Sequence, residues 1–128
     1  SFAVRHLNCD AGIVLTASHN PSKYNGYKAY GPDGCQLSPS ASEYVLSIIN
    51  KVDIFDDVKT CNFEDAVKSG KINYIDKSVN DAYLEAVKAQ SLSDYSYNFE
   101  NIKVIYTPLN GAGNKPVRTI LEKIGVKK

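Results

Sequence analysis

The sequence predicts an α/β fold in which helices pack against a mixed sheet. Two kinds of pattern carry this prediction. Short apolar runs rich in β-branched or aromatic residues, bounded by turn residues, predict strands at 13–16, 27–30 and 102–106. Apolar residues at helical spacing predict amphipathic helices, and the clearest set is Ala41, Tyr44, Val45, Ile48, Ile49 and Val52.

The composition is that of an ordinary globular chain and argues against several classes of protein. With 128 residues, 43% of them hydrophobic and 23% charged, the chain is long enough for one domain with a sizeable core. A formal net charge of +1 argues against a nucleic-acid partner, which normally requires a basic excess. No apolar run approaches a membrane span and no signal peptide begins the chain, so we expect no membrane partner.

The 3 cysteines, Cys9, Cys35 and Cys61, are odd in number and far apart in the sequence. They form no metal-ligand spacing, and we interpret them as packing residues. Their pattern indicates a reducing, cytoplasmic setting.

The first half of the chain is expected to alternate short elements with turns. Residues 2–7 are predicted to end a helix, and a connection then leads to the strand at 13–16. Asn25-Gly26 turns the chain back into the strand at 27–30. Gly31-Pro32-Asp33-Gly34 is a predicted turn, after which residues 35–37 return as a short strand.

Helices dominate the expected structure after residue 37. Ser40-Ala41-Ser42-Glu43 predicts a capping box for the helix at 41–52. An acidic loop at 53–57, a short helix at 63–69 ended by Gly70 and a strand at 72–75 follow. Ser78 is predicted to cap a second long helix, whose expected buried face is Val79, Ala82, Tyr83, Ala86 and Val87.

The C-terminal part is predicted to hold a linker at 91–98, a strand at 102–106 and a Gly-rich loop at 108–113. A third helix follows, with Val117, Ile120, Leu121 and Ile124 facing inward. This strand, loop and helix form half of a βαβ unit. We therefore expect the chain to be a fragment of a longer enzyme.

The clearest chemical pattern follows the first predicted strand and reads Thr16-Ala17-Ser18-His19-Asn20-Pro21. Pro21 restricts the residue before it to extended or turn geometry. The Asn25-Gly26 turn brings back a strand that carries Lys28. A serine that handles phosphoryl groups needs an exposed hydroxyl, with cations and backbone N–H groups around its phosphate. An ordinary turn serine is the alternative for Ser18 alone.

These residues resemble the phosphoserine loop of the α-D-phosphohexomutases, the superfamily of phosphoglucomutases and phosphomannomutases. The similarity continues through Tyr24-Asn25-Gly26-Tyr27-Lys28 and through residues 30–34. It resumes at 106–111, which is similar to the segment that opens the second domain of that family. The resemblance implies most of domain I at residues 1–97 and the start of domain II at 98–128.

The resemblance implies catalytic roles for Ser18, His19 and Lys28. Ser18 would pass a phosphoryl group to a hexose phosphate and take one back from the sugar bisphosphate intermediate, which also serves as activator. His19 would lie beside the phosphate or the sugar, and Lys28 would act as general acid and base. Asn20 and Asn25 would support the loop. Mg²⁺ would bind Ser18 through its phosphate. The alternative for His19 and Lys28 is a solvated surface position.

The implied reaction converts glucose 1-phosphate and glucose 6-phosphate into each other, with a small-molecule sugar phosphate as the partner. The sequence looks most like the subgroup of phosphoglucomutases and phosphopentomutases. A pentose, mannose or aminosugar phosphate is an alternative substrate, because the family's sugar-selecting loop is absent from this sequence. A rival from another class is a non-catalytic binding module that keeps the serine loop as a scaffold.

Other family segments are absent as well, namely the arginine-bearing opening segment, the aspartate-rich magnesium loop and the C-terminal phosphate-binding loop. We therefore expect the remaining domains of the parent chain as partners and no activity from this fragment alone. The sequence has Asn110 where the family more often has histidine. Asp53, Asp56 and Asp57 lack a calcium-loop pattern, and Gly111-Ala112-Gly113 fails the dinucleotide fingerprint.

Overall fold

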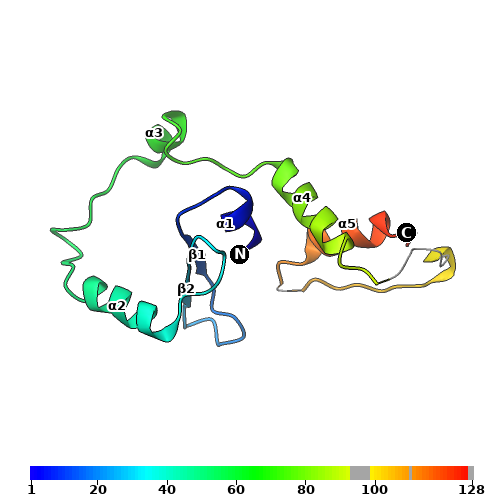
Figure 1. Cartoon of the computed structure of the whole chain (residues 1–128), viewed down its shortest axis with the longest axis horizontal. Coiled ribbons are helices and arrows are strands. Elements are labelled where there is room, and N and C mark those ends of the chain that lie inside the picture. The colour runs from blue at the N-terminus through cyan, green and yellow to red at the C-terminus, as the bar shows by residue number, and fades with distance from the viewer. Residues whose placement is uncertain (93–98, 110, 127–128) are drawn as a thin grey trace. The chain divides into compact units, whose positions relative to one another are not determined.

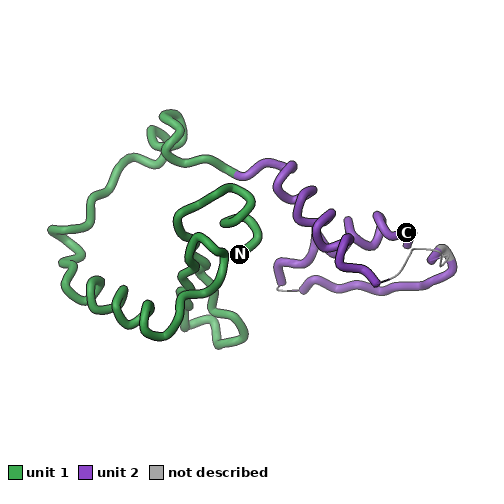
Figure 2. Tube along the Cα trace, in the orientation of Figure 1, with its two compact units in different colours: residues 1–74 green, residues 75–128 purple. Residues whose placement is uncertain are grey.

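The structure is a computed structural model that describes residues 1–92, 99–109 and 111–126. It contains helices and a small antiparallel sheet (Figure 1), which confirms the predicted α/β class. The chain divides into two compact units, residues 1–74 and 75–128 (Figure 2), and each unit is described by itself. The domain boundary predicted at 97/98 falls in a stretch, 93–98, that lies outside the described residues, as does most of the predicted linker.

The first unit begins with α1 (Phe2–His6), which packs on a two-stranded antiparallel sheet of β1 (Gly12–Leu15) and β2 (Tyr27–Tyr30). Gly12 opposes Tyr30 in the ladder, and Leu15 opposes Tyr27. The packing of α1 is close, since a Cβ on Gly12 would stand 2.5 Å from a methyl carbon of Val4. The helix and both strands were predicted from the sequence.

One hydrogen bond extends the β1–β2 pairing beyond the strands. The Thr16 N–H donates to the Gly26 carbonyl oxygen at 2.8 Å. The two backbones approach so closely here that a Cβ on Gly26 would overlap the Thr16 carbonyl oxygen. Glycine is therefore required at position 26 for steric reasons.

Helix α2 (Pro39–Ile49) confirms the predicted helix but not its capping box. Ser38, not Ser40, is the N-cap, and its hydroxyl accepts the Ala41 N–H at 3.3 Å. Proline is favoured at the first helical position because an N–H at that position has no acceptor within the helix, so its absence costs nothing. Pro39 at the first helical position thus places the cap at Ser38, two residues before the predicted Ser40. No α2 residue is buried, and Tyr44 on the predicted inner face is 68% exposed.

The acidic loop and the short helix at the end of the first unit form as predicted. The Asp53 carboxylate accepts the N–H groups of Phe55 and Asp56, and these two bonds lower the pKa of Asp53. Helix α3 (Phe63–Lys68) is capped by Asn62, whose side-chain oxygen accepts the Asp65 N–H. The chain leaves α3 through Gly70 at a φ of +74°, a conformation that glycine adopts readily.

The second unit contains α4 (Lys77–Lys88), a short 3₁₀ helix η1 (Phe99–Asn101) and α5 (Asn114–Lys123). The predicted cap Ser78 is wrong, because Asp76 is the N-cap of α4. The Asp76 carboxylate accepts both the Ser78 hydroxyl, at 2.5 Å, and the Ser78 N–H, at 2.8 Å. These bonds lower the pKa of Asp76. An aspartate two positions ahead thus accepts the donors of the serine, so Ser78 lies inside the helix.

Helices α4 and α5 are joined by an ion pair between Lys123 Nζ and Glu85 Oε1 at 2.5 Å. The hydrogen bond from Lys123 lowers the pKa of Glu85 and raises that of Lys123. The predicted inner face of α4 is only partly right. Val79 is buried, but Tyr83 is 43% exposed and the buried leucine Leu84 was not predicted. The predicted inner residues of α5 are all half-buried.

Three predicted strands are not formed among the described residues, at 35–37, 72–75 and 102–106. Gln36 makes only an isolated bridge to Tyr30. The other two segments have strand-like composition, but a strand forms only where another edge accepts its hydrogen bonds. Ile105 is accordingly fully exposed, at 100%.

Buried apolar residues are few in the described part of the chain, and they are Val4, Ala66, Val79 and Leu84. The helices therefore depend on their caps and on local hydrogen bonds more than on a shared core. The described residues contain no helix with the length and apolar character needed to cross a membrane.

We predict that Gly26→Ala breaks the Thr16–Gly26 backbone bond. The added methyl group would occupy the position of the Thr16 carbonyl oxygen, so the two backbones must move apart. Amide hydrogen exchange at Thr16 should become at least several-fold faster. Gly111→Ala is the control, since its Cβ would make an ordinary 3.7 Å contact. Unchanged exchange at Thr16 in Gly26→Ala would show that the loop tolerates a side chain there.

We also predict that the N-terminus of α4 loosens in acid. The pKa of Asp76 is lower in the folded chain than in the unfolded chain, so its stabilisation is present above the unfolded value. That stabilisation begins to be lost as pH falls below the ordinary aspartate pKa of about 3.9, and the loss continues as pH falls through the lower folded value. The protection of the Ser78 amide against hydrogen exchange, relative to its intrinsic exchange rate at the same pH, should therefore fall in acid. Asp76→Asn keeps a capping oxygen that does not titrate, and an equal acid response in this variant would contradict the prediction.

Candidate functional site

The candidate site is the loop between β1 and β2, defined here as the serine loop, residues 16–26. Ser18 has a φ of +52°, in the left-handed region that costs a non-glycine residue about 1–2 kcal/mol. Its N–H donates to the Thr16 hydroxyl oxygen at 2.9 Å. A strained backbone at a predicted nucleophile suggests that the surrounding hydrogen bonds impose this geometry for a functional reason.

The serine loop brings two of the predicted catalytic groups together. Ser18 Oγ lies 3.2 Å from His19 Nδ1, and both residues are exposed. Either atom can be the donor, because the direction depends on which ring nitrogen carries the proton. An imidazole at hydrogen-bond distance from a hydroxyl can take its proton or return one, so the pair suits a nucleophilic oxygen.

Asn20 and Asn25 occupy turns of the loop. The Asn20 N–H donates to the Ala17 carbonyl oxygen at 2.9 Å and closes a turn around Ser18 and His19. The side-chain oxygen of Asn25 accepts the Gly26 N–H at 3.0 Å. Both asparagines thus lie where they can brace the loop, one through its backbone and one through its side chain.

Lys28 lies in β2 opposite Val14, outside the serine loop. It is exposed and lines a small hollow of about 150 Å³ between β2 and α2, together with Leu37, Val45 and Ile49. Ser18 does not line this hollow. The structure therefore pairs Ser18 with His19 and places Lys28 on the neighbouring strand.

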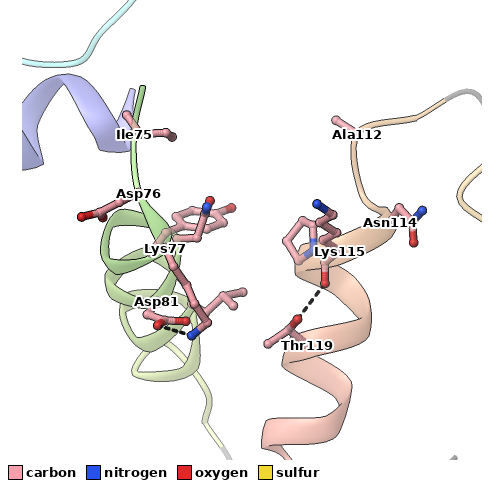
Figure 3. Close-up of a pocket in the computed structure, with 12 residues that line it drawn as sticks. Ile75, Asp76, Lys77, Asp81, Ala112, Asn114, Lys115 and Thr119 are labelled. Carbon is pink, nitrogen blue, oxygen red and sulfur yellow. Dashed lines mark hydrogen bonds and ion pairs between the residues drawn. The ribbon is translucent and has the colours of Figure 1, made fainter. Parts of the chain in front are cut away.

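A larger hollow of about 780 Å³ lies in the second unit between α4 and α5 (Figure 3). None of the predicted site residues lines it. Among its polar groups, Lys77 pairs with Asp81 at 2.5 Å within α4, and the Thr119 hydroxyl donates to the Lys115 carbonyl within α5. We therefore place the candidate site at the serine loop, where the reactive side chains meet.

The donor set of the described residues does not fit a complete magnesium site. No group of three or more His, Cys, Asp or Glu side chains gathers anywhere in 1–92, 99–109 and 111–126. The loop offers Ser18 as one point of attachment for a phosphate, whereas Mg²⁺ requires an octahedral shell of oxygen ligands.

The sequence does not predict the structural roles of two loop residues. By pattern, Thr16 is only the end of a strand and Gly26 is only half of a turn. The structure shows that Thr16 contacts the Ser18 N–H and that Gly26 meets the Thr16 carbonyl oxygen. A threonine two positions before a serine was the available signal, because its hydroxyl can accept the backbone N–H two residues on.

Comparison with known proteins gives the relatives of this chain. Residues 1–54 match the family described as phosphoglucomutase/phosphomannomutase, alpha/beta/alpha domain I. The chain is 42% identical over 124 residues to a phosphoglucomutase of Staphylococcus saprophyticus, a match that covers 97% of this chain and 22% of the relative. It is 37% identical over 127 residues to phosphoglucomutases of Staphylococcus aureus strains USA300 and N315, with the same coverage.

The chain thus spans about a fifth of the length of these relatives. No solved structure matches it. Residues 1–54, which contain the whole serine loop, match domain I of the phosphoglucomutase/phosphomannomutase family, and this match confirms the resemblance to the α-D-phosphohexomutases predicted from the sequence.

Proposed function

We propose that this chain is part of a longer phosphosugar mutase that interconverts glucose 1-phosphate and glucose 6-phosphate. The observation that carries the proposal is the exposed Ser18 hydroxyl, held at a strained backbone position and paired with His19. The relatives named phosphoglucomutase support the choice of sugar.

In the proposed reaction Ser18 carries the phosphoryl group between the two ends of the sugar. The phosphorus leaves Ser18 Oγ and bonds to a free hydroxyl oxygen of the sugar phosphate, while that hydroxyl gives up its proton and Ser18 Oγ takes one. The product is a sugar bisphosphate. The phosphoryl group at the other end of the sugar then passes to Ser18 Oγ, which gives up its proton, and the freed sugar oxygen takes a proton.

The proton steps are assigned to two side chains. His19 lies at hydrogen-bond distance from Ser18 Oγ and is assigned the serine proton. Lys28, on the strand that follows the loop, is assigned the proton of the sugar hydroxyl. Asn20 and Asn25 keep the loop in shape through the bonds described above. These roles rest on the geometry and on the family resemblance together.

Mg²⁺ and a sugar bisphosphate activator belong to the same proposal. Phosphorylated Ser18 would supply one phosphate oxygen to the ion, which would neutralise charge on the group in transfer. The other ligands would come from outside the described residues, since these hold no acidic cluster. The cytoplasmic setting expected from the cysteines stays a prediction.

Ser18→Ala should abolish mutase turnover in the full-length enzyme at every pH. The substitution removes the oxygen that bonds to phosphorus, and no change of cofactor replaces it. Turnover is measured with glucose 1-phosphate, magnesium and bisphosphate activator. Ser22→Ala is the control, because it removes a hydroxyl from an exposed position of the same loop. Wild-type turnover in Ser18→Ala would favour the binding-module alternative.

Lys28→Ala should slow turnover by about 10²–10⁴-fold, the usual size of general acid–base catalysis. The variant keeps Ser18, so labelled sugar bisphosphate should still label the protein. Lys23→Ala serves as control, because Lys23 lies 5.1 Å from the Tyr24 ring centroid on the exposed part of the loop. Failure to label Lys28→Ala would assign the lysine to phosphate binding or folding, and full turnover would make it a solvated strand residue.

The 128-residue chain alone should show no mutase turnover. Transfer requires the sugar, its distal phosphate and the metal to be held together, and positioning of this kind supplies much of the rate. The assay uses the purified chain, with the full-length enzyme at equal concentration as the positive control. Turnover by the purified chain, free of contaminating enzyme, would contradict the prediction.

A further inference from the structure

We propose that Thr16 is a positioning residue for phosphoryl transfer at Ser18. Its hydroxyl holds the Ser18 backbone in the left-handed conformation and thereby aims the Ser18 hydroxyl at the phosphoryl group. This inference rests on the function proposed above and names the side chain that prepares Ser18 for it. Thr16 acts through Ser18 and does not have to touch the substrate.

The first part of the argument is the bond between the two residues. The Ser18 N–H donates to Thr16 Oγ1 at 2.9 Å, and Ser18 is the residue whose φ is +52°. This conformation is sterically unfavourable for serine, whereas glycine adopts it readily. The hydrogen bond from the Ser18 N–H to Thr16 Oγ1 therefore stabilises the left-handed conformation, which Ser18 would otherwise leave.

The second part is that Thr16 is itself firmly placed. Its N–H donates to the Gly26 carbonyl oxygen at 2.8 Å, and its own carbonyl oxygen lies against the bare Cα of Gly26. Thr16 is half-buried, whereas Ser18 and His19 are exposed. Its branched Cβ also restricts the side-chain rotamer. The hydroxyl that holds Ser18 is thus attached to the end of the β1–β2 ladder.

The third part is the consequence for the reacting oxygen. Ser18 Oγ lies 3.2 Å from His19 Nδ1, and the Ser18 backbone conformation sets the direction in which Oγ points. If the Ser18 N–H loses its acceptor, φ can relax to negative values and Oγ moves away from the imidazole. Misplacement of a reacting group by about 1 Å can cost about 10²-fold in rate. Binding of the sugar phosphate depends on Thr16 much less.

The test compares three variants of the full-length enzyme. Thr16→Val keeps the branched shape but removes the hydroxyl, and Thr16→Ser keeps the hydroxyl but removes the methyl group. Thr60→Val is the matched control in an exposed loop of the same unit. Amide hydrogen exchange at Ser18 reports the backbone bond directly. Steady-state kinetics with glucose 1-phosphate reports the effect on transfer.

We expect Thr16→Val to lower kcat by about 10–100-fold with KM changed by less than about threefold, and to speed exchange at the Ser18 amide. Thr16→Ser should retain most of kcat and of the amide protection, and Thr60→Val should match the wild type. Wild-type kcat in Thr16→Val would overturn the proposal. Equal losses in Thr16→Val and Thr16→Ser would also overturn it, since the methyl group would then be the part that matters.

Failure of the function proposed above would look different. Ser18→Ala would then turn over at the wild-type rate, while Thr16→Val would still speed amide exchange at Ser18. Unchanged amide exchange in Thr16→Val, with Ser18→Ala inactive, would instead overturn the role of Thr16 and leave Ser18 as the phosphoryl carrier.

Discussion

The candidate site depends on the close approach of two backbones at the end of the β1–β2 ladder. Gly26 has no side chain, so the Thr16 carbonyl oxygen can occupy the space that a Cβ would fill. This contact fixes Thr16, and the Thr16 hydroxyl in turn accepts the N–H of Ser18. As a result, Ser18 adopts the left-handed conformation beside the imidazole of His19 on an exposed loop. The backbone geometry of Ser18 therefore depends on Gly26, which lies eight positions further along the chain.

The rest of the described chain is held by local hydrogen bonds. Ser38, Asn62 and Asp76 each accept a backbone N–H in the first turn of the helix that follows, so the helices begin where a polar side chain can serve their free donors. Long-range contacts are fewer, and the Glu85–Lys123 ion pair between α4 and α5 is one of them. Both partners are exposed, so this pair adds little to the stability of the chain.

The sequence predicted the elements whose signals are local. The strands around the serine loop, the helices at 39–49 and 77–88 and the end of α3 at Gly70 all follow from side-chain periodicity, caps and turn residues. The cap positions were missed because Pro39 and Asp76 compete for the helix start with the serines that follow them. The strands expected at 72–75 and 102–106 depend on a distant partner, which composition does not reveal. The pairing of Ser18 with His19 could be anticipated because the two residues are adjacent, but the hydrogen bond from the Ser18 N–H to Thr16 depends on the fold of the loop.

The central claim is that Ser18 carries the phosphoryl group, and chemical localisation of that group tests it most directly. The full-length enzyme is incubated with sugar bisphosphate carrying labelled phosphoryl groups, digested, and mapped by mass spectrometry. The account predicts one labelled phosphoryl group on Ser18 that is discharged when glucose 1-phosphate is added. A label on Ser22 or on another residue, or a phosphate on Ser18 that does not pass to the sugar, would contradict it.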